Sequence, residues 1–314
     1  MRAVAIKALN SPPELTDLPK PTPGPGEILV HLGAASVNPV DWLIASDSRP
    51  GAPSPNFPFI LGADGAGVVE GVGEGVSRFK IGDGVFGQFL HPPFGTGTYA
   101  EFITAPESLG ISKTPRGIYT GPAAAVPTAG MTALTAVEAL GLRKGQTLLI
   151  QGAKGGVGSF ATQLASNLGI LVVAASRGDH GAFQRKLGAF EYFDSSRIGW
   201  TRDYRNAHPN GVDAALDLVG AHRLTDPTPA LVRDNGVIGT PVTAPGASPT
   251  PERGIRVVPI HLRPSSELLD RLSAEITSGR VRIPVEMQVP LAEAPQALEL
   301  SRQGATRGKT VINI

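Results

Sequence analysis

The residues best suited to chemistry in this chain form a glycine-rich turn after an apolar stretch. Residues 147–151 read TLLIQ, and residues 152–158 read GAKGGVG. Against the pattern G-x-G-x-x-G, Ala153 stands at the first glycine position, and Gly155 and Gly158 stand at the other two. Such glycines let the backbone approach a pyrophosphate at the N-terminus of the next helix. A turn without a ligand also uses glycine, but the helical and second apolar stretches that follow favour a dinucleotide site.

Two polar residues follow where a dinucleotide-binding protein contacts the adenosine ribose. That contact falls about 20 residues after the glycines, and Ser176 lies 21 residues after Gly155. An NAD-specific protein usually has Asp or Glu there, whereas Ser176 and Arg177 can hydrogen-bond and neutralise a 2′-phosphate. The pair favours NADPH as the cofactor. Two alternatives stay open: Asp179 close by would reverse the preference, and Arg177 would otherwise be a solvated loop residue.

Two regions with different sequence patterns predict the elements that would position these residues. Up to residue 122, short apolar runs separated by Pro and Gly clusters predict the strands of a compact β barrel or sandwich. From residue 123, strand patterns alternate with helical ones, including helices over 157–169 and near 222–234, which predicts a parallel, doubly wound α/β sheet. We therefore predict domains at 1–122 and 123–260. Residues 261–314 would return to complete the first domain, because they are too few to fold alone.

Composition narrows the possible partners and sites. The chain has 314 residues and no cysteine, so disulfides, thiolate metal sites and cysteine nucleophiles are excluded. Lys and Arg number 28 against 27 Asp and Glu, and no run of like charges marks a nucleic-acid or membrane surface. No apolar stretch resembles a signal peptide or a membrane span. We expect a cytoplasmic protein with a small-molecule substrate.

With these motifs in place, the sequence resembles the zinc-free quinone oxidoreductase branch of the medium-chain dehydrogenase/reductases, which includes zeta-crystallin-like and enoyl-reductase-like proteins. The resemblance spans nearly the whole chain and rests on eight segments in order: AASVNPVDW (34–42), PFILGADGAGVV (58–69), GVSRFKIGDGVFG (75–87), GTYAEF (97–102), PTAGMTAL (127–134), GAKGGVGSFATQLA (152–165), VDAALDLVG (212–220) and RGKTVINI (307–314). It implies a GroES-like catalytic domain and a Rossmann NADP-binding domain, with the active site in the cleft between them.

The resemblance also shows what this chain lacks. Zinc-dependent relatives have Gly-His-Glu where this chain has Gly62, Ala63 and Asp64, and the six histidines form no HxH or HExxH pair. We therefore expect no catalytic zinc. Oxidation of an unactivated alcohol needs a group that takes up the hydroxyl proton, whereas a quinone or a conjugated enone is already electrophilic.

The resemblance assigns roles to particular residues. Asn38 and Asp41 would be catalytic residues beside the nicotinamide and its ribose, and Thr128 would lie near the carboxamide. From the residues alone, the NPVD segment that contains Asn38 and Asp41 would be a turn. The full set of cofactor contacts implied is Asn38, Thr128, Lys154, Gly155, Gly156, Val157, Gly158, Ser176, Arg177, Leu218, Val219, Gly239 and Thr240.

The substrate would be an apolar, conjugated carbonyl compound contacted by Trp42, Arg49, Phe57 and Phe89. Arg49 and Leu43 stand where related reductases have tyrosines, so neither can supply a phenolic proton. Arg49 would hold an anionic group or lie at the surface, and Trp42 would serve in packing or substrate contact. Lys154 is a weak candidate for the missing proton donor, and solvent is the simpler source. Tyr99 fits a barrel residue.

The function favoured is an NADPH-dependent, zinc-free reductase that transfers hydride to a quinone or to the C=C bond of an enone or enoyl substrate. A dedicated biosynthetic enoyl reductase and a non-catalytic NADPH-binding protein are the alternatives, because fold alone does not decide among them. The resemblance further implies a homodimer or homotetramer, with the strand near residues 256–259 at the interface.

Overall fold

The computed structural model describes residues 1–46, 55–219, 228–241 and 251–314, which form two compact units. The first unit comprises residues 1–129, 264–277 and 283–314, and the second comprises 130–263 and 278–282. Arg49 lies outside the described residues. Among the described residues, no helix is long and apolar enough to cross a membrane.

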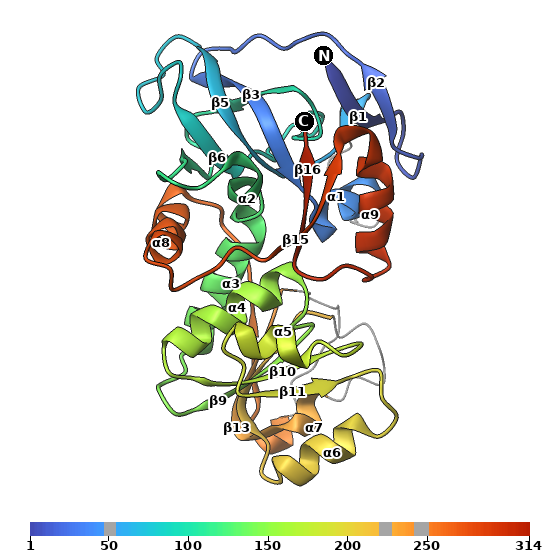
Figure 1. Cartoon of the computed structure of the whole chain (residues 1–314), viewed down its shortest axis with the longest axis vertical. Helices are drawn as coiled ribbons and strands as arrows, with labels where there is room; N and C mark the ends of the chain where they lie inside the picture. The colour runs from blue at the N-terminus through green and yellow to red at the C-terminus, as the bar shows by residue number, and fades with distance from the viewer. Residues whose placement is uncertain (47–54, 220–227, 242–250) are drawn as a thin grey trace. The chain divides into compact units, whose positions relative to one another are not determined.

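The first unit is built mainly on antiparallel strands, with one parallel pair formed by its two C-terminal strands (Figure 1). Its large sheet has the order β15-β16-β3-β5-β6-β8, with β7 paired to β3, and a small sheet has the order β2-β1-β4. The strands are β1 (Arg2–Ile6), β2 (Glu14–Asp17), β3 (Glu27–Ser36), β4 (Phe59–Ile60), β5 (Asp64–Val72), β6 (Gly84–Gln88), β7 (Phe102–Pro106), β8 (Ile111–Lys113), β15 (Val285–Pro290) and β16 (Lys309–Asn313).

Apolar side chains of this unit form buried clusters, of which one contains Val30, Leu32 and Phe89 and another contains Ile6, Leu61 and Tyr99. Short helices surround the sheets: α1 (Pro39–Ala45), α2 (Thr120–Ala124), α8 (Ser266–Thr277), the 3-10 turn η2 (Leu291–Glu293) and α9 (Ala294–Arg302). The strand-rich pattern of the first third of the sequence is therefore confirmed as a mostly β unit.

The C-terminal segment returns to the first unit, where β16 pairs antiparallel with β3 and α9 contacts α1 (Figure 1). One short segment of the predicted return segment 261–314 does not join the first unit. Residues 278–282 belong to the second unit, because the Asn167 and Gln163 side chains donate to the carbonyls of Arg280 and Arg282 at 2.9 and 3.0 Å. The first boundary lies after residue 129, seven residues beyond the predicted position.

The second unit is a parallel, six-stranded sheet in the order β11-β10-β9-β12-β13-β14, so the predicted doubly wound α/β fold is confirmed. Its elements are α3 (Pro127–Leu140, which begins in the first unit), β9 (Thr147–Gln151), α4 (Gly156–Asn167), β10 (Leu171–Ser176), α5 (Gly181–Lys186), β11 (Glu191–Asp194), α6 (Trp200–Ala207), β12 (Val212–Asp217), α7 (Thr228–Leu231), β13 (Val232–Thr240), the 3-10 turn η1 (Pro251–Arg253) and β14 (Arg256–Pro259).

The predicted helix near 222–234 is wrong at its C-terminal end. Residues 222–227 lie outside the described residues, α7 ends at Leu231, and β13 begins at Val232. Leu231 and Val232 are buried with Tyr204 in the apolar cluster of the second unit. Tertiary packing and pairing with β12 thus override the local helical pattern.

Candidate functional site

A buried polar network occupies the first unit where β3, α1 and β5 meet. β3 ends at Ser36, Asn38 is the N-cap of α1, and Pro39 opens the helix, a position that suits proline. The Asn38 backbone N–H donates to Asp41 Oδ2 at 2.8 Å, which is one half of a capping box. The NPVD segment is thus both a helix start and the origin of two buried polar side chains, since Asn38 is 2% exposed and Asp41 is 3% exposed.

Asp41 is held by donors from three parts of the chain. Besides the Asn38 N–H, the Ala63 N–H donates to Oδ1 at 2.9 Å and the Tyr99 hydroxyl donates to Oδ2 at 2.8 Å. These donors favour the carboxylate, but burial opposes them and raises the pKa of Asp41 to about 7. The Tyr99 side chain is fully buried, so this tyrosine is a structural partner of Asp41 within the barrel.

Asp64, at the start of β5, links two of the predicted cofactor residues. Its Oδ2 accepts from Asn38 Nδ2 and from the Thr128 N–H, both at 2.9 Å, and its Oδ1 accepts from Thr128 Oγ1 at 2.6 Å. Gln88 Nε2 donates to the same Thr128 oxygen at 3.2 Å. Burial raises the pKa of the Asp64 carboxyl, and the charge of Lys309 opposes that rise.

Lys309, the first residue of β16, supplies the positive charge of the network. Its Nζ donates to Asn38 Oδ1 at 2.6 Å and to the Val37 carbonyl at 2.8 Å, and the residue is 3% exposed. Burial lowers the pKa of the ammonium, whereas Asp64 and Asp41 favour its charged form. One buried cation therefore faces two buried carboxyl groups across Asn38.

Sequence reasoning missed Lys309 as a site residue and treated Asp64 only as a departure from a zinc motif. A detectable signal existed in each case. Lys309 directly precedes the uncharged segment TVINI, and Asp64 lies within the otherwise small and apolar segment LGADGAG. A charged side chain at a buried position of a strand needs a partner, but the sequence does not say which one.

The pKa of Asp41 leads to a testable pH dependence of stability. The carboxyl titrates near 3.8 when unfolded and near 7 when folded, so between these values the folded state binds the extra proton. The free energy of unfolding therefore falls as the pH rises through this interval and levels off above about pH 7. Between about pH 5 and pH 7 the stabilisation that Asp41 contributes falls by about 2 kcal/mol.

Urea unfolding of wild type and Asp41→Asn at about pH 5 and pH 7 measures this contribution. The variant is less stable than wild type at every pH, because an amide cannot accept from all three donors. Its residue 41 does not titrate, so it does not contribute to the slope of the free energy of unfolding against pH. Wild type should lose more stability than the variant between the two pH values. Asp64, Lys309 and Tyr99, which face Asp41, are present in both proteins. Parallel pH profiles would show that Asp41 does not carry the slope.

In the second unit, the glycine turn joins β9 to α4 as predicted. Gly155 is the N-cap of α4, and Gly152 adopts a φ of +80° that favours glycine. A Cβ on Gly158 would lie 2.6 Å from the Gly152 carbonyl oxygen and the Ala153 Cα. The helix thus packs directly on the strand–turn backbone, and the amides of its first turn remain available for an anion.

Ser176 is the last residue of β10, and Arg177 follows it. The Tyr192 hydroxyl donates to the Ser176 carbonyl at 2.9 Å and lies 3.1 Å from Ser176 Oγ, which holds this corner against β11. Partial burial lowers the pKa of Lys154, and the nearby positive charge of Arg177 lowers it further. The structure thus brings together two predicted cofactor residues, and an anion would relieve their mutual repulsion.

The predicted cofactor residues Leu218, Val219, Gly239 and Thr240 lie at the carboxyl edge of the same sheet. Strand register aligns Gln151 of β9 with Ala175 of β10 and Asp217 of β12. Leu218 donates its N–H to the Gln151 carbonyl at 3.1 Å. Val219 follows with 62% of its surface exposed. Gly239 and Thr240 end β13. This edge is where parallel α/β sheets bind their ligands.

The predicted substrate residues do not share one environment. Phe57 is 42% exposed, whereas Phe89 has no exposed surface and packs in an apolar cluster with Val30 and Ile103. Phe89 therefore occupies a core position in place of the expected substrate contact, because it follows β6 into the barrel interior. Trp42 packs on the other apolar cluster, and its Nε1 is buried without a hydrogen-bond partner in the described structure.

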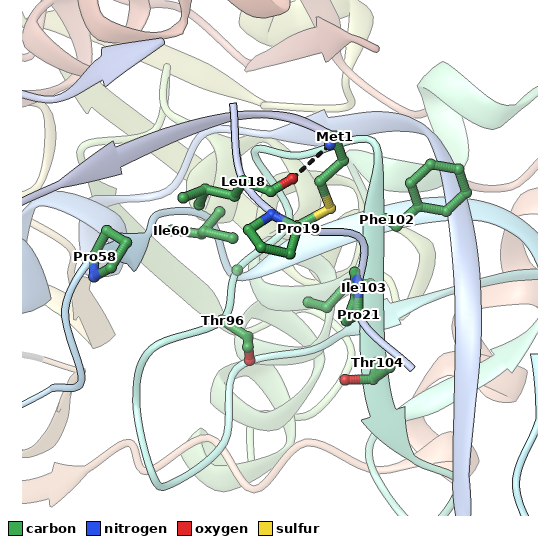
Figure 2. Close-up of a pocket in the computed structure, with 11 residues that line it drawn as sticks. Met1, Leu18, Pro19, Pro21, Pro58, Ile60, Thr96, Phe102, Ile103 and Thr104 are labelled. Atoms are coloured by element: carbon green, nitrogen blue, oxygen red, sulfur yellow. Dashed lines mark hydrogen bonds between the residues drawn. The ribbon is translucent and has the colours of Figure 1, made fainter. Parts of the chain in front are cut away.

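An apolar cavity of about 270 Å³ lies elsewhere in the first unit (Figure 2). Leu18, Ile60, Phe102 and Ile103 contribute to its lining, and the Met1 ammonium donates to the Leu18 carbonyl at 2.6 Å beside it. No side chain that lines it is titratable. The cavity therefore offers apolar contact and no acid–base chemistry.

The residues present do not fit a catalytic zinc. The chain has no cysteine, and within the described ranges no three side chains of His, Asp or Glu converge as a metal site requires. The glycine turn does fit a dinucleotide, because a side chain at Gly158 would collide with the backbone that the helix must approach. Zinc-free chemistry itself stays a prediction.

Two protein-family models match different parts of this chain. The model of the alcohol dehydrogenase GroES-like domain matches residues 24–116, and that of the zinc-binding dehydrogenases matches residues 187–312. A chloroplast envelope quinone oxidoreductase homolog of Arabidopsis thaliana is 32% identical, covering 95% of this chain and 93% of its own. A 2-methylene-furan-3-one reductase of Solanum lycopersicum is 29% identical over 91% of this chain and 71% of its own.

A solved mycobacterial structure, determined in complex with NADPH, covers all of this chain and all of its own at 27% identity with a TM-score of 0.87. Similarity therefore extends over both units and over the order of their segments. The chain belongs to the medium-chain dehydrogenase/reductase family, among its quinone oxidoreductase-like members.

Proposed function

We propose that this protein is a cytoplasmic, NADPH-dependent reductase that transfers hydride, without zinc, to a quinone or to the C=C bond of an enone or enoyl compound. The observation that carries the proposal is the corner formed by the glycine turn and the end of β10, where Lys154 and Arg177 stand beside the start of α4. Two cations and a helix N-terminus suit the 2′-phosphate and pyrophosphate of NADPH. The mycobacterial relative in complex with NADPH supports the same cofactor.

The residues of the first unit support the choice of an electrophilic substrate. Asn38, Asp41 and Asp64 are committed to one another, to Lys309 or to backbone groups. These three side chains are therefore not arranged as ligands of a metal ion. NADPH, when bound, supplies the hydride, and a conjugated carbonyl accepts it without a Lewis acid. The names of the Arabidopsis and tomato relatives support quinone and enone substrates.

The source of the proton in C=C reduction follows from burial. Tyr99 is fully buried and donates to Asp41, so its hydroxyl cannot reach a substrate. Lys154 lies beside Arg177, in the corner proposed for the adenosine end of the cofactor. We therefore propose solvent as the proton source, with Asn38 and Asp41 shaping the site beside the nicotinamide rather than delivering the proton.

A panel of substrates tests this function. Purified protein is mixed with NADPH or NADH and a naphthoquinone, a small enone, an enoyl thioester or a simple aldehyde, and absorbance at the NADPH band is followed. We expect oxidation of NADPH with the quinone or enone, little reaction with the aldehyde, and no loss after treatment with a metal chelator. Product analysis separates quinone reduction from C=C reduction.

Other outcomes of the panel have defined meanings. Turnover of the enoyl thioester alone would indicate a dedicated biosynthetic enoyl reductase. NADPH binding without turnover of any compound would indicate a non-catalytic NADPH-binding protein. Absence of NADPH binding would contradict the proposal itself.

We further propose a homodimer or homotetramer. β14 is an edge strand of the six-stranded sheet as described, and it pairs only with β13 there. A second copy could continue the sheet at this edge, since an unpaired strand presents free backbone donors and acceptors.

A further inference from the structure

Asp64 fixes the direction of the Thr128 hydroxyl. An ionised carboxylate has no hydrogen to give, so each polar neighbour must donate to it. Thr128 does so twice, through its backbone N–H at 2.9 Å and through Oγ1 at 2.6 Å. A hydroxyl has one hydrogen, and that of Thr128 is directed at Asp64. Toward any further partner, Thr128 Oγ1 can therefore only accept.

The contact with Gln88 is consistent with this direction. Gln88 Nε2 donates to Thr128 Oγ1 at 3.2 Å, so the oxygen already serves as an acceptor toward one partner. Thr128 and Gln88 are both partly exposed, whereas Asp64 has no exposed surface. The buried carboxylate thus controls a hydroxyl at the boundary between the interior and the surface of the first unit.

Asn38 and Lys309 support the ionised form of Asp64. Asn38 Nδ2 donates to Asp64 at 2.9 Å, and Lys309 Nζ donates to Asn38 Oδ1 at 2.6 Å. The Lys309 bond fixes which end of the Asn38 amide faces Asp64, since an ammonium can only donate. Three donors then surround Asp64, and two of them, Asn38 Nδ2 and the Thr128 backbone N–H, can only donate to this carboxyl.

We propose that Asp64 is a positioning residue that presents Thr128 Oγ1 as an acceptor for the carboxamide N–H of the nicotinamide, with Lys309 maintaining this arrangement through Asn38. The proposal rests on the proposed function and on the family resemblance, which implies that Thr128 lies near the carboxamide. It adds two residues, Asp64 and Lys309, and it assigns a direction to the hydrogen bond of Thr128.

A cofactor analogue tests the direction of that bond. In the 3-acetylpyridine analogue of NADPH a methyl group replaces the amide NH₂, so the analogue cannot donate to Thr128. We expect wild type to bind NADPH about threefold to tenfold more tightly than the analogue by calorimetry, the range for one hydrogen bond. Thr128→Val should bring this ratio close to one. Thr128→Ser, which keeps the hydroxyl, should preserve it.

Asp64→Asn tests the positioning residue itself. The new amide would direct its NH₂ at Thr128 Oγ1 or at Asn38, so the Thr128 hydroxyl turns outward and the ratio falls toward one. Asp17→Asn on exposed β2 is the matched control and should keep the ratio of wild type. Binding of 2′,5′-ADP, which lacks the nicotinamide, should stay unchanged in every variant.

If Asp64→Asn does not fold, Asp64→Asn/Lys309→Met removes both buried charges and gives the same readout. A ratio near one in wild type, or a wild-type ratio in a folded Asp64 variant, would overturn the inference while leaving the function intact. Failure of wild type to bind NADPH would instead remove the proposed function. Loss of 2′,5′-ADP binding along with the ratio would show a general structural defect and would also overturn the inference.

Discussion

Replacement of Lys309 by methionine is expected to lower the free energy of unfolding at pH 7 by about 3–5 kcal/mol, the range for breaking a buried charge pair on one side. Methionine approximates the length of the stem but cannot donate to Asn38 Oδ1 or to the Val37 carbonyl, which lie 2.6 and 2.8 Å from Nζ. Asp64 and Asp41 would remain buried without a cation. Urea unfolding followed by circular dichroism measures the loss.

Two further proteins and a pH series define the cause. Lys113→Met removes a lysine that is 57% exposed and pairs with Asp83 at the surface, and it should cost little. Asp64→Asn/Lys309→Met should recover part of the loss, since only Asp41 then remains as a buried carboxyl without the ammonium. The deficit of Lys309→Met should also shrink below pH 7, because burial raises the pKa of Asp41 and of Asp64. A loss no larger than that of Lys113→Met would contradict the role of Lys309 as a buried counter-ion.

The second large effect is expected at Arg177. Arg177→Ala should weaken NADPH binding roughly tenfold to hundredfold, the range for charge-assisted hydrogen bonds, and should leave NADH binding nearly unchanged. The reason is that the 2′-phosphate is the only group that distinguishes the two cofactors. The partly buried Lys154 lies beside Arg177, so adding Lys154→Ala should weaken NADPH binding further. Calorimetric titration with both cofactors measures the difference.

The control for Arg177 comes from the same unit. Arg202 on α6 is 77% exposed and pairs with its neighbour Asp203 at 3.6 Å, so Arg202→Ala should change neither affinity. An equal loss of NADPH and NADH binding in Arg177→Ala would mean that Arg177 supports the loop after β10 and does not contact the phosphate. Tighter NADH than NADPH binding in wild type would favour the alternative in which Asp179 directs the preference.

The sequence by itself determined the features that depend on near neighbours along the chain. The strand, glycine turn and helix around Gly155 and Gly158 follow from local periodicity and from steric limits of the backbone. The start of α1 at Asn38 was not among these features, because Asn-Pro and Asp favour turns as well as helix N-termini, and the residues alone indicated a turn. The change from strand-rich to alternating pattern predicted the mostly β unit and the doubly wound sheet, because each pattern reflects the side of an element that must be buried.

Only the tertiary structure decided which distant side chains share a site. Lys309 and Asn38 are 271 residues apart in sequence, and Thr128 and Asp64 are 64 apart. Their contacts depend on strand pairing and chain reversal, which no local pattern specifies. The same holds for Phe89, whose burial depends on residues from several strands. Local sequence limits backbone conformation, whereas the partner of a buried charge is set by the packing of the whole unit.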